Sequence, residues 1–317
     1  MDAHLAFHFA AGVDFVIATD HRSGDGTSEI LDRYASEGVL RVIREESEVA
    51  RQSEWQTRMA RLAAAEHDAD WVIPSDADEF WWPRAGSIPK ALESVPAEFG
   101  IARALTRNFV PPYDDHGWFG DRMTLRLATP APINDPGTPF RPVVKVVHRG
   151  HPRVRVAGGG HQVFGVPWPL FTDWNPLEVL HFPLRSRYQY ARKYEKTWTG
   201  WPENLRGDLA RARDVAEQGR PEAMWVRVAL GDADVRQGLA AGSLVRDTRL
   251  RDALGPLLRE PPSETARRTL PTPAAEEQTR HAVEAAVFDE AEVVRAQRWV
   301  DELSERVARL EKAGRSA

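Results

Sequence analysis

The chain has 317 residues, a formal net charge of −5 at pH 7 and no cysteine. That length allows one large domain or two of moderate size, with a sizeable hydrophobic core. The negative charge argues against a nucleic-acid partner, and the lack of cysteine excludes disulfides and thiolate metal sites. The sequence contains no apolar run of the ~18 residues that a membrane span needs and no signal-peptide pattern. We therefore expect a cytoplasmic protein, with peripheral membrane association as the alternative.

The first third of the chain alternates between strand and helix patterns. Residues 15–19 (Phe-Val-Ile-Ala-Thr), 39–43 and 71–73 are short apolar runs typical of buried strands. Residues 28–37 and about 49–67 have helical spacing. Such alternation predicts an α/β sheet whose ligands bind beyond the carboxyl ends of its strands.

Polar residues follow two of the predicted strands. Residues 20–27 (Asp-His-Arg-Ser-Gly-Asp-Gly-Thr) form a turn in which Asp25 or Thr27 is expected to cap the next helix. After residues 71–73 come Asp76 and Asp78, with Glu79 beside them. In an extended backbone, residues two apart point to the same side, so Asp76 and Asp78 are expected to share one ligand.

Carboxylates at the end of a buried strand need a positive partner. Mg²⁺ or Mn²⁺ prefers hard oxygen ligands, and the phosphates of a substrate would complete its shell. A second Gly-Asp-Ala-Asp occurs at residues 231–234, and there we expect only a solvated helix start.

These motifs resemble those of a known enzyme family. Residues 20–27 resemble the Asp-Asn-x-Ser-x-Asp-Gly-Thr turn of family-2 glycosyltransferases, and residues 76–80 resemble the metal-binding Asp-x-Asp-Glu-Phe motif of a glycosyltransferase-2-like branch. The similarity covers roughly residues 2–198. It implies a GT-A fold, in which one Rossmann-like, nucleotide-sugar-binding sheet continues into an acceptor-binding half. Later blocks of the same branch resemble residues 144–147, 160–163 and 180–186, with Tyr190 and Lys193 after them.

The resemblance implies a metal-dependent glycosyltransferase that inverts the anomeric carbon. It would use Mn²⁺ or Mg²⁺ and move a sugar from a nucleoside-diphosphate sugar to a hydroxyl of a glycan or small-molecule acceptor. The expected metal ligands are Asp78 and His181, the last at the end of another apolar run, and Asp76, which would bind either the metal or the ribose of the nucleotide sugar.

Other site residues follow from the same comparison. Asp20 is expected to contact the nucleoside, although a helix-entry turn would also place an aspartate there. Arg185 and Lys193 could neutralise the diphosphate, or they could lie on a solvated helix face. The candidates for the catalytic base are His161, which follows three glycines, and Asp173. Tryptophans near these blocks, among them Trp81-Trp82, either pack against sugar or are ordinary core residues, and the place of Trp81-Trp82 after the acidic turn favours sugar contact.

The N-terminal segment departs from the family pattern. Members normally begin with a central strand that touches the nucleobase, followed by a helix, and this sequence begins at Met1 inside that helix. We therefore expect a gap, or a substitute strand, between the strands at residues 15–19 and 71–73. Direct pairing of those strands would contradict this expectation.

Residues 1–200 are expected to form the GT-A domain and residues 201–317 a helical C-terminal region, with a linker near residues 260–273. A heptad pattern over residues 289–313 would either pair two chains as a homodimer or pack on the body of its own chain. Two other functions stay open. One is a catalytically inactive glycan-binding or scaffolding protein. The other is a sugar nucleotidyltransferase, although the glycine-rich basic loop of that class is missing.

Overall fold

The computed structural model of the protein describes residues 1–128, 143–190, 225–226, 228–258 and 270. Its helices are α1 (Asp2–Ala10), α2 (Thr27–Ser36), α3 (Gln52–Glu66), α4 (Ile88–Leu92), α5 (Phe119–Arg122), the short 3₁₀ turn η1 (Gly158–Gly160), α9 (Asp232–Ala240) and α10 (Arg249–Leu257). Within these ranges, no helix has the length and apolar character needed to cross a bilayer.

Twelve strands occur in the same ranges. They are β1 (Val16–His21), β2 (Leu40–Glu45), β3 (Trp71–Val72), β4 (Glu79–Pro83), β5 (Ile101–Asn108), β6 (Leu125–Leu127), β7 (Val144–Arg149), β8 (Arg155–Val156), β9 (Val163–Phe164), β10 (Leu170–Phe171), β11 (Leu177–His181) and β12 (Leu244–Arg246). The fold is therefore mixed α/β.

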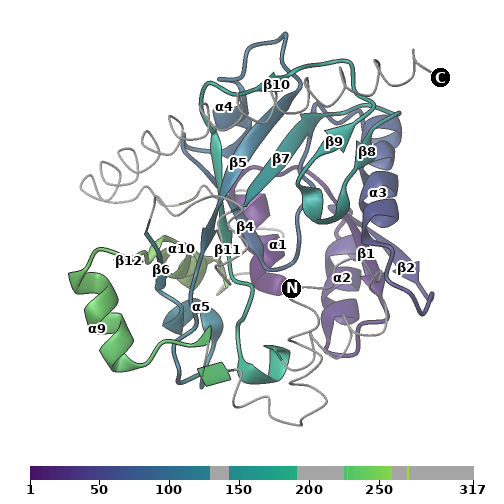
Figure 1. Ribbon diagram of the computed structural model, residues 1–317. Coiled ribbons are helices and arrows are strands. Elements are labelled where there is room, and N and C mark those ends of the chain that lie inside the picture. Colours follow the sequence, from purple (N-terminus) through teal and green to yellow (C-terminus); the bar gives the residue numbers. More distant parts are fainter. Residues whose placement is uncertain (129–142, 191–224, 227, 259–269, 271–317) are drawn as a thin grey trace, which may run out of the picture.

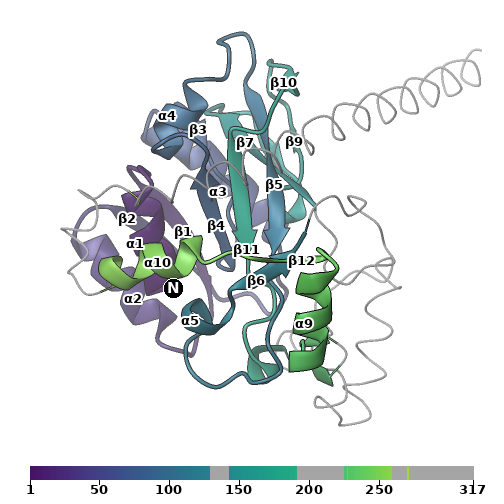
Figure 2. The ribbon, with the colours of Figure 1, turned by 90° about the vertical axis from the view of Figure 1, so that its left-hand side faces the viewer.

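The main sheet has six strands in the order β3-β7-β5-β11-β4, with β10 paired to β5. It is mixed, because β11 runs parallel to β5 and antiparallel to β4, and β7 is antiparallel to both of its neighbours. Strands β1 and β2 form a separate parallel pair, and β6–β12 and β8–β9 form antiparallel pairs. The β1–β2 and β6–β12 pairs lie on opposite sides of the main sheet (Figures 1 and 2).

The predicted elements of the first third are present with small shifts of their ends. Leu5 and Phe9 of α1 pack with Leu31 and Tyr34 of α2 in one apolar cluster, which also includes Leu40 of β2. The second Gly-Asp-Ala-Asp, at residues 231–234, lies at the start of α9, as predicted, with Gly231 as the N-cap residue. However, the prediction of a single sheet for this region was wrong, because β1 and β2 stand apart from the main sheet.

A cavity of about 990 Å³ lies between β1 and β3. Residues 13–19 line it on one side and residues 70–77 on the other, and we call it the slot. Strand β1 pairs only with β2, and β3 pairs only with β7, so no strand within the described ranges pairs with the edges that face the slot. The gap predicted from the sequence is therefore present.

The segment after residue 228 belongs to the same body as the N-terminal part. Leu250, Leu254 and Leu257 of α10 are buried in the main core with Phe7 of α1, and β12 pairs with β6. Leu270, which falls in the predicted linker, is buried in that core too. A boundary at residue 200 therefore does not divide the described residues into two packing units. The heptad segment at residues 289–313 lies outside them.

Five buried charged residues tie α10 and β12 to the main sheet. Glu178 of β11 accepts hydrogen bonds from Arg107 of β5 (2.8 Å) and Arg249 of α10 (2.9 Å). Arg249 and Arg126 also donate to Asp247, each at 2.8 Å. Burial alone would raise the pKa of Glu178, but Arg107 and Arg249 hold that pKa well below its usual range.

We predict that Glu178→Ala lowers the free energy of unfolding by about 3–5 kcal/mol, because it leaves two buried arginines without their shared carboxylate. Urea denaturation of the full chain measures this change. Glu54→Ala is the matched control, since the Glu54 side chain is 69% exposed in its pair with Arg51 and its loss should change stability by less than about 0.5 kcal/mol. Equal effects of the two substitutions would contradict a structural role for the buried charges.

Candidate metal centre

The strand register places three polar residues side by side at one end of the main sheet. His181, the last residue of β11, is opposite Glu79 of β4 on one side and opposite Asn108 of β5 on the other. Directly opposed residues in neighbouring strands lie ~4.5–5.5 Å apart, so their side chains can share a ligand. Asp78 immediately precedes β4, and therefore lies at the same end.

Asp78, Glu79 and His181 form a group whose ligand atoms all lie within 4.8 Å of one another. His181 Nε2 is 3.8 Å from Asp78 Oδ2, which confirms the predicted proximity of these two residues. The His181 ring donates from Nδ1 to Asn108 Oδ1 at 2.7 Å. That bond orients the ring and leaves Nε2 as the ligand atom, the usual arrangement of a metal-binding histidine. Two carboxylates and an imidazole suit a divalent cation.

The acidic motif is a turn rather than an extended strand end. The backbone N–H of Glu79 donates to the carbonyl of Asp76 at 3.1 Å, which is the bond of a β-turn. The extended backbone assumed for this segment was therefore wrong, and a ligand shared by Asp76 and Asp78 stays a prediction. The Asp76 carboxylate accepts hydrogen bonds from Lys145 (3.0 Å) and Gln52 (2.8 Å). Glu79 takes the place in the metal-ligand group that was expected for Asp76.

Lys145 supplies the positive charge that this turn needs. Its side chain is 3% exposed and forms ion pairs with both Asp76 and Glu79. Burial alone would lower the pKa of Lys145, but Glu79 and Asp76 raise it. Burial, and then repulsion by Asp76, raises the pKa of Glu79 to about 8 despite the nearby ammonium. Lys145 was not among the site residues predicted from the sequence, although one lysine among the valines of residues 144–147 was an available signal.

Asp20 is engaged in its own turn. Its carboxylate accepts hydrogen bonds from Ser23 N (3.1 Å) and Ser28 Oγ (2.5 Å), and Arg44 donates to it as well. Burial would raise the pKa of Asp20, but these hydrogen bonds lower it. These are the contacts of a helix-entry residue, and the nucleoside contact stays a prediction. Asp25 accepts a hydrogen bond from Thr27 N at 3.3 Å, in line with its expected capping role.

His161 is held near the acidic turn by a glycine-rich loop. A Cβ on Gly160 would lie 2.7 Å from the carbonyl oxygen of Pro74, and a Cβ on Gly159 would lie 2.9 Å from His161 Nε2. Both glycines also have positive φ, which other residues rarely adopt. The loop can therefore pass close to the segment before Asp76. The His161 ring donates from Nδ1 to Val144 O at 2.9 Å, which leaves Nε2 as a proton acceptor.

The two remaining described candidates differ in position. Arg185 donates to the carbonyl of Ala77 at 3.1 Å, and its buried Nε has no hydrogen-bond partner among the described residues. It therefore lies beside the acidic turn. Asp173 precedes β11, whereas His181 ends that strand, so the two lie towards opposite ends of the sheet. The structure does not bring Asp173 to the metal centre. Lys193 lies outside the described residues.

The tryptophans next to the acidic turn are core residues. Trp81 is fully buried and Trp82 is 6% exposed, and the Arg249 guanidinium stacks 5.2 Å from the centre of the Trp82 ring. The prediction that they contact sugar was wrong, because both side chains are buried in the main core. Trp174 is 41% exposed but follows β10, away from the metal centre. Trp198 and Trp201 lie outside the described ranges.

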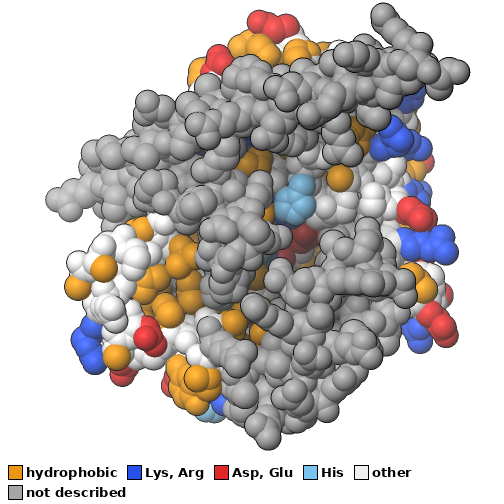
Figure 3. Space-filling model, in the orientation of Figure 1, with side chains coloured by type: hydrophobic (Ala, Val, Ile, Leu, Met, Phe, Trp, Pro, Cys, Tyr) orange, Lys and Arg blue, Asp and Glu red, His pale blue; other side chains and the backbone are white. Residues whose placement is uncertain are grey.

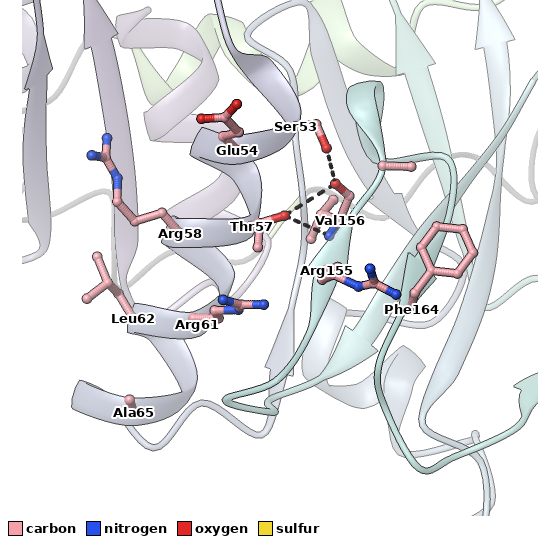
Figure 4. Close-up of a pocket in the computed structure, with 11 residues that line it drawn as sticks. Ser53, Glu54, Thr57, Arg58, Arg61, Leu62, Ala65, Arg155, Val156 and Phe164 are labelled. Carbon is pink, nitrogen blue, oxygen red and sulfur yellow. Dashed lines mark hydrogen bonds between the residues drawn. The ribbon is translucent and has the colours of Figure 1, made fainter.

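A second cavity of about 810 Å³ lies between α3 and the β8–β9 hairpin (Figure 4). Ser53 and Thr57 of α3 both donate to the carbonyl of Val156, and the N–H of Val156 donates to Thr57 Oγ1. The edge of β8 is thus already hydrogen-bonded by the helix. None of the candidate catalytic or metal-binding residues lines this cavity.

Histidine and acidic side chains gather at the centre of one face of the molecule (Figure 3). Comparisons of the chain with protein-family models, with curated proteins and with solved structures found no match.

We predict that affinity for Mn²⁺ rises between about pH 7 and pH 8, by up to roughly tenfold. The pKa of Glu79 is raised to about 8, so a rising pH removes the proton that competes with the cation, and affinity must increase in that direction. Calorimetric titration at several pH values measures the slope. Glu79→Gln keeps the size of the side chain but has no titratable carboxyl group. This variant should bind Mn²⁺ more weakly at pH 8, and its affinity should change less with pH. The same pH dependence of Mn²⁺ affinity in both proteins would show that Glu79 is not a ligand of the cation.

Proposed function

We propose that the protein is a metal-dependent glycosyltransferase of GT-A type, which transfers a sugar from a nucleoside-diphosphate sugar to an acceptor hydroxyl. The observation that carries the proposal is the Asp78–Glu79–His181 group at the end of β4 and β11. The resemblance of residues 20–27 and 76–80 to glycosyltransferase motifs supports the same function. The α/β architecture, with polar residues beyond the strand ends, is compatible with it.

The residues around the centre suit the departure of a diphosphate. A divalent cation held by Asp78, Glu79 and His181 would supply positive charge next to the leaving group. The Nε of Arg185, beside the same turn, has no hydrogen-bond partner in the part of the chain that the structure describes and can donate to a phosphate oxygen. Lys145 keeps Asp76 and Glu79 compensated, so the carboxylates need not be stabilised by the substrate alone.

Transfer also requires a base for the acceptor hydroxyl. As the acceptor oxygen forms its bond to the anomeric carbon, the bond from that carbon to the diphosphate oxygen breaks, and the hydroxyl proton passes to the base. We assign this role to His161, whose Nε2 is available because Nδ1 donates to Val144 O. Burial, followed by the charge of Lys145, lowers the pKa of His161, which favours the neutral ring that a base requires.

Asp78→Ala should lower the affinity for a nucleoside diphosphate in the presence of Mn²⁺ by at least about tenfold, because it removes a charged metal ligand. Calorimetry with uridine and guanosine diphosphates measures binding. Hydrolysis of a panel of nucleotide sugars, with and without Mn²⁺, tests the enzymatic function itself.

Asp234→Ala is the matched control, since it changes the second copy of the motif. Asp234 accepts a hydrogen bond from Gly231 N at 3.0 Å at the start of α9. Its loss should cost about 1 kcal/mol of stability and leave diphosphate binding unchanged. Equal diphosphate affinity in the wild type and in Asp78→Ala would overturn the assignment of the centre.

A further inference from the structure

The second cavity, between α3 and the β8–β9 hairpin, has walls that are fixed to each other. Ser53, Thr57 and Arg61 follow at steps of four residues along α3, so they lie on one face of the helix. Each of them bonds to the hairpin side of the cavity. Ser53 Oγ donates to Val156 O at 2.6 Å, Val156 N donates to Thr57 Oγ1 at 2.9 Å, and Arg61 Nε donates to Val154 O at 2.8 Å. The cavity is therefore formed before any ligand binds.

The lining of this cavity is basic, although the chain as a whole is acidic. The formal net charge of the chain is −5, yet three arginines and one glutamate line the cavity. Arg58 pairs with Glu45, and the single glutamate pairs with Arg51. No carboxylate in the described part of the chain pairs with the guanidinium of Arg61 or of Arg155. Two positive charges therefore lie in the cavity without an internal counterion.

These two arginines converge on one place, beside an exposed aromatic ring. Arg155 of β8 is directly opposite Phe164 of β9, so the two side chains lie on the same face of the hairpin. Figure 4 shows Arg61 and Arg155 extending toward each other across the cavity, with Phe164 beside Arg155. Arg58 points away from the hairpin in the same view. Phe164 is 48% exposed, which is unusual for a phenylalanine that lines a cavity.

We propose that the second cavity binds a small-molecule phosphate monoester with an aromatic body. The phosphate lies between the guanidinium groups of Arg61 and Arg155, and the aromatic ring packs on Phe164. Because Val154 O takes only the Nε of Arg61, both terminal amino groups of that guanidinium can donate to phosphate oxygens. Leu62 and Ala65 supply further apolar surface along the helix side.

Charge and size both select this class of ligand. A phosphate monoester carries a charge of about −1.5 to −2 at pH 7, which balances two guanidinium groups, whereas a carboxylate would balance only one. The volume of about 810 Å³ falls within the range of roughly 300–1,000 Å³ that small-molecule sites occupy. Aromatic rings prefer an offset or edge-on contact with another ring, and the exposed ring of Phe164 offers that contact at the cavity wall.

The test uses phenyl phosphate as the probe, with the full chain in a metal-free buffer at about 0.15 M salt. Calorimetric titration measures its dissociation constant, and phenol and inorganic phosphate are titrated in parallel. Arg155→Ala is the principal variant, because the Arg155 guanidinium has no ion pair to lose within the described chain. Arg58→Ala is the matched control, since it removes an arginine of the same lining that already pairs with Glu45.

Arg155→Ala and Arg61→Ala should each weaken phenyl phosphate binding by at least about fivefold, because each removes a charge-assisted contact to the phosphate. Arg58→Ala should leave the affinity within about twofold, since its charge is compensated and screened. Phe164→Ala should weaken phenyl phosphate by about threefold and leave inorganic phosphate unchanged, as it removes only the ring contact. Phenol, which lacks the phosphate, should bind at least about tenfold more weakly than phenyl phosphate.

Three results would overturn the proposal. They are the absence of phenyl phosphate binding to the wild type, equal affinity in the wild type and Arg155→Ala, and the same loss in Arg58→Ala as in Arg155→Ala. Thermal unfolding of each variant confirms that the compared proteins are folded. The buffer holds no metal, and the cavity shares no residue with the Asp78–Glu79–His181 group. The outcome is therefore independent of the proposed function.

Discussion

The register of β11 between β4 and β5 is the constraint on which the candidate metal centre depends. The pairing that aligns His181 with Glu79 and Asn108 also aligns Glu178 for its bonds to Arg107 and Arg249. A slip of one residue would turn every side chain of β11 to the opposite face, and would separate Glu178 from both buried arginines. The buried charges thus fix the same alignment that assembles the candidate ligands three residues later.

Charge compensation explains how three carboxylates fit into one tight turn. Lys145 pairs with Asp76 and Glu79 from the neighbouring β7 strand, while Asp78 lies nearest to His181. Without an internal cation, ionised groups with so little exposure would be very costly to bury. The lysine therefore compensates Asp76 within the protein, whereas Asp78 belongs with Glu79 and His181 to the group that can attract an external cation.

The sequence predicted the features that depend on local pattern. It did not predict those that depend on contacts between segments far apart in the chain. Apolar runs located β1, β2 and β11, and hence the position of His181 at a strand end. The turn at Asp76 could not be recognised, because its partner Lys145 comes from a strand 69 positions later. Likewise, the burial of Trp81 follows from packing against α1 and α10 in the main core, which no periodicity of the acidic segment indicates. The gap beside β1 was predictable only by comparison with the expected strand order.

The position of a bound cation is the most direct test of the candidate metal centre. Crystals of the full chain soaked with Mn²⁺ and measured at the manganese absorption edge should give one strong anomalous peak. We expect that peak between Asp78 and His181, roughly 2.0–2.6 Å from a carboxylate oxygen and from Nε2, with Glu79 as a further ligand. Two results would contradict the metal centre and the function proposed from it. One is a cation bound to Asp76 at the position that the Lys145 ammonium occupies, and the other is the absence of any peak where β4 begins and β11 ends.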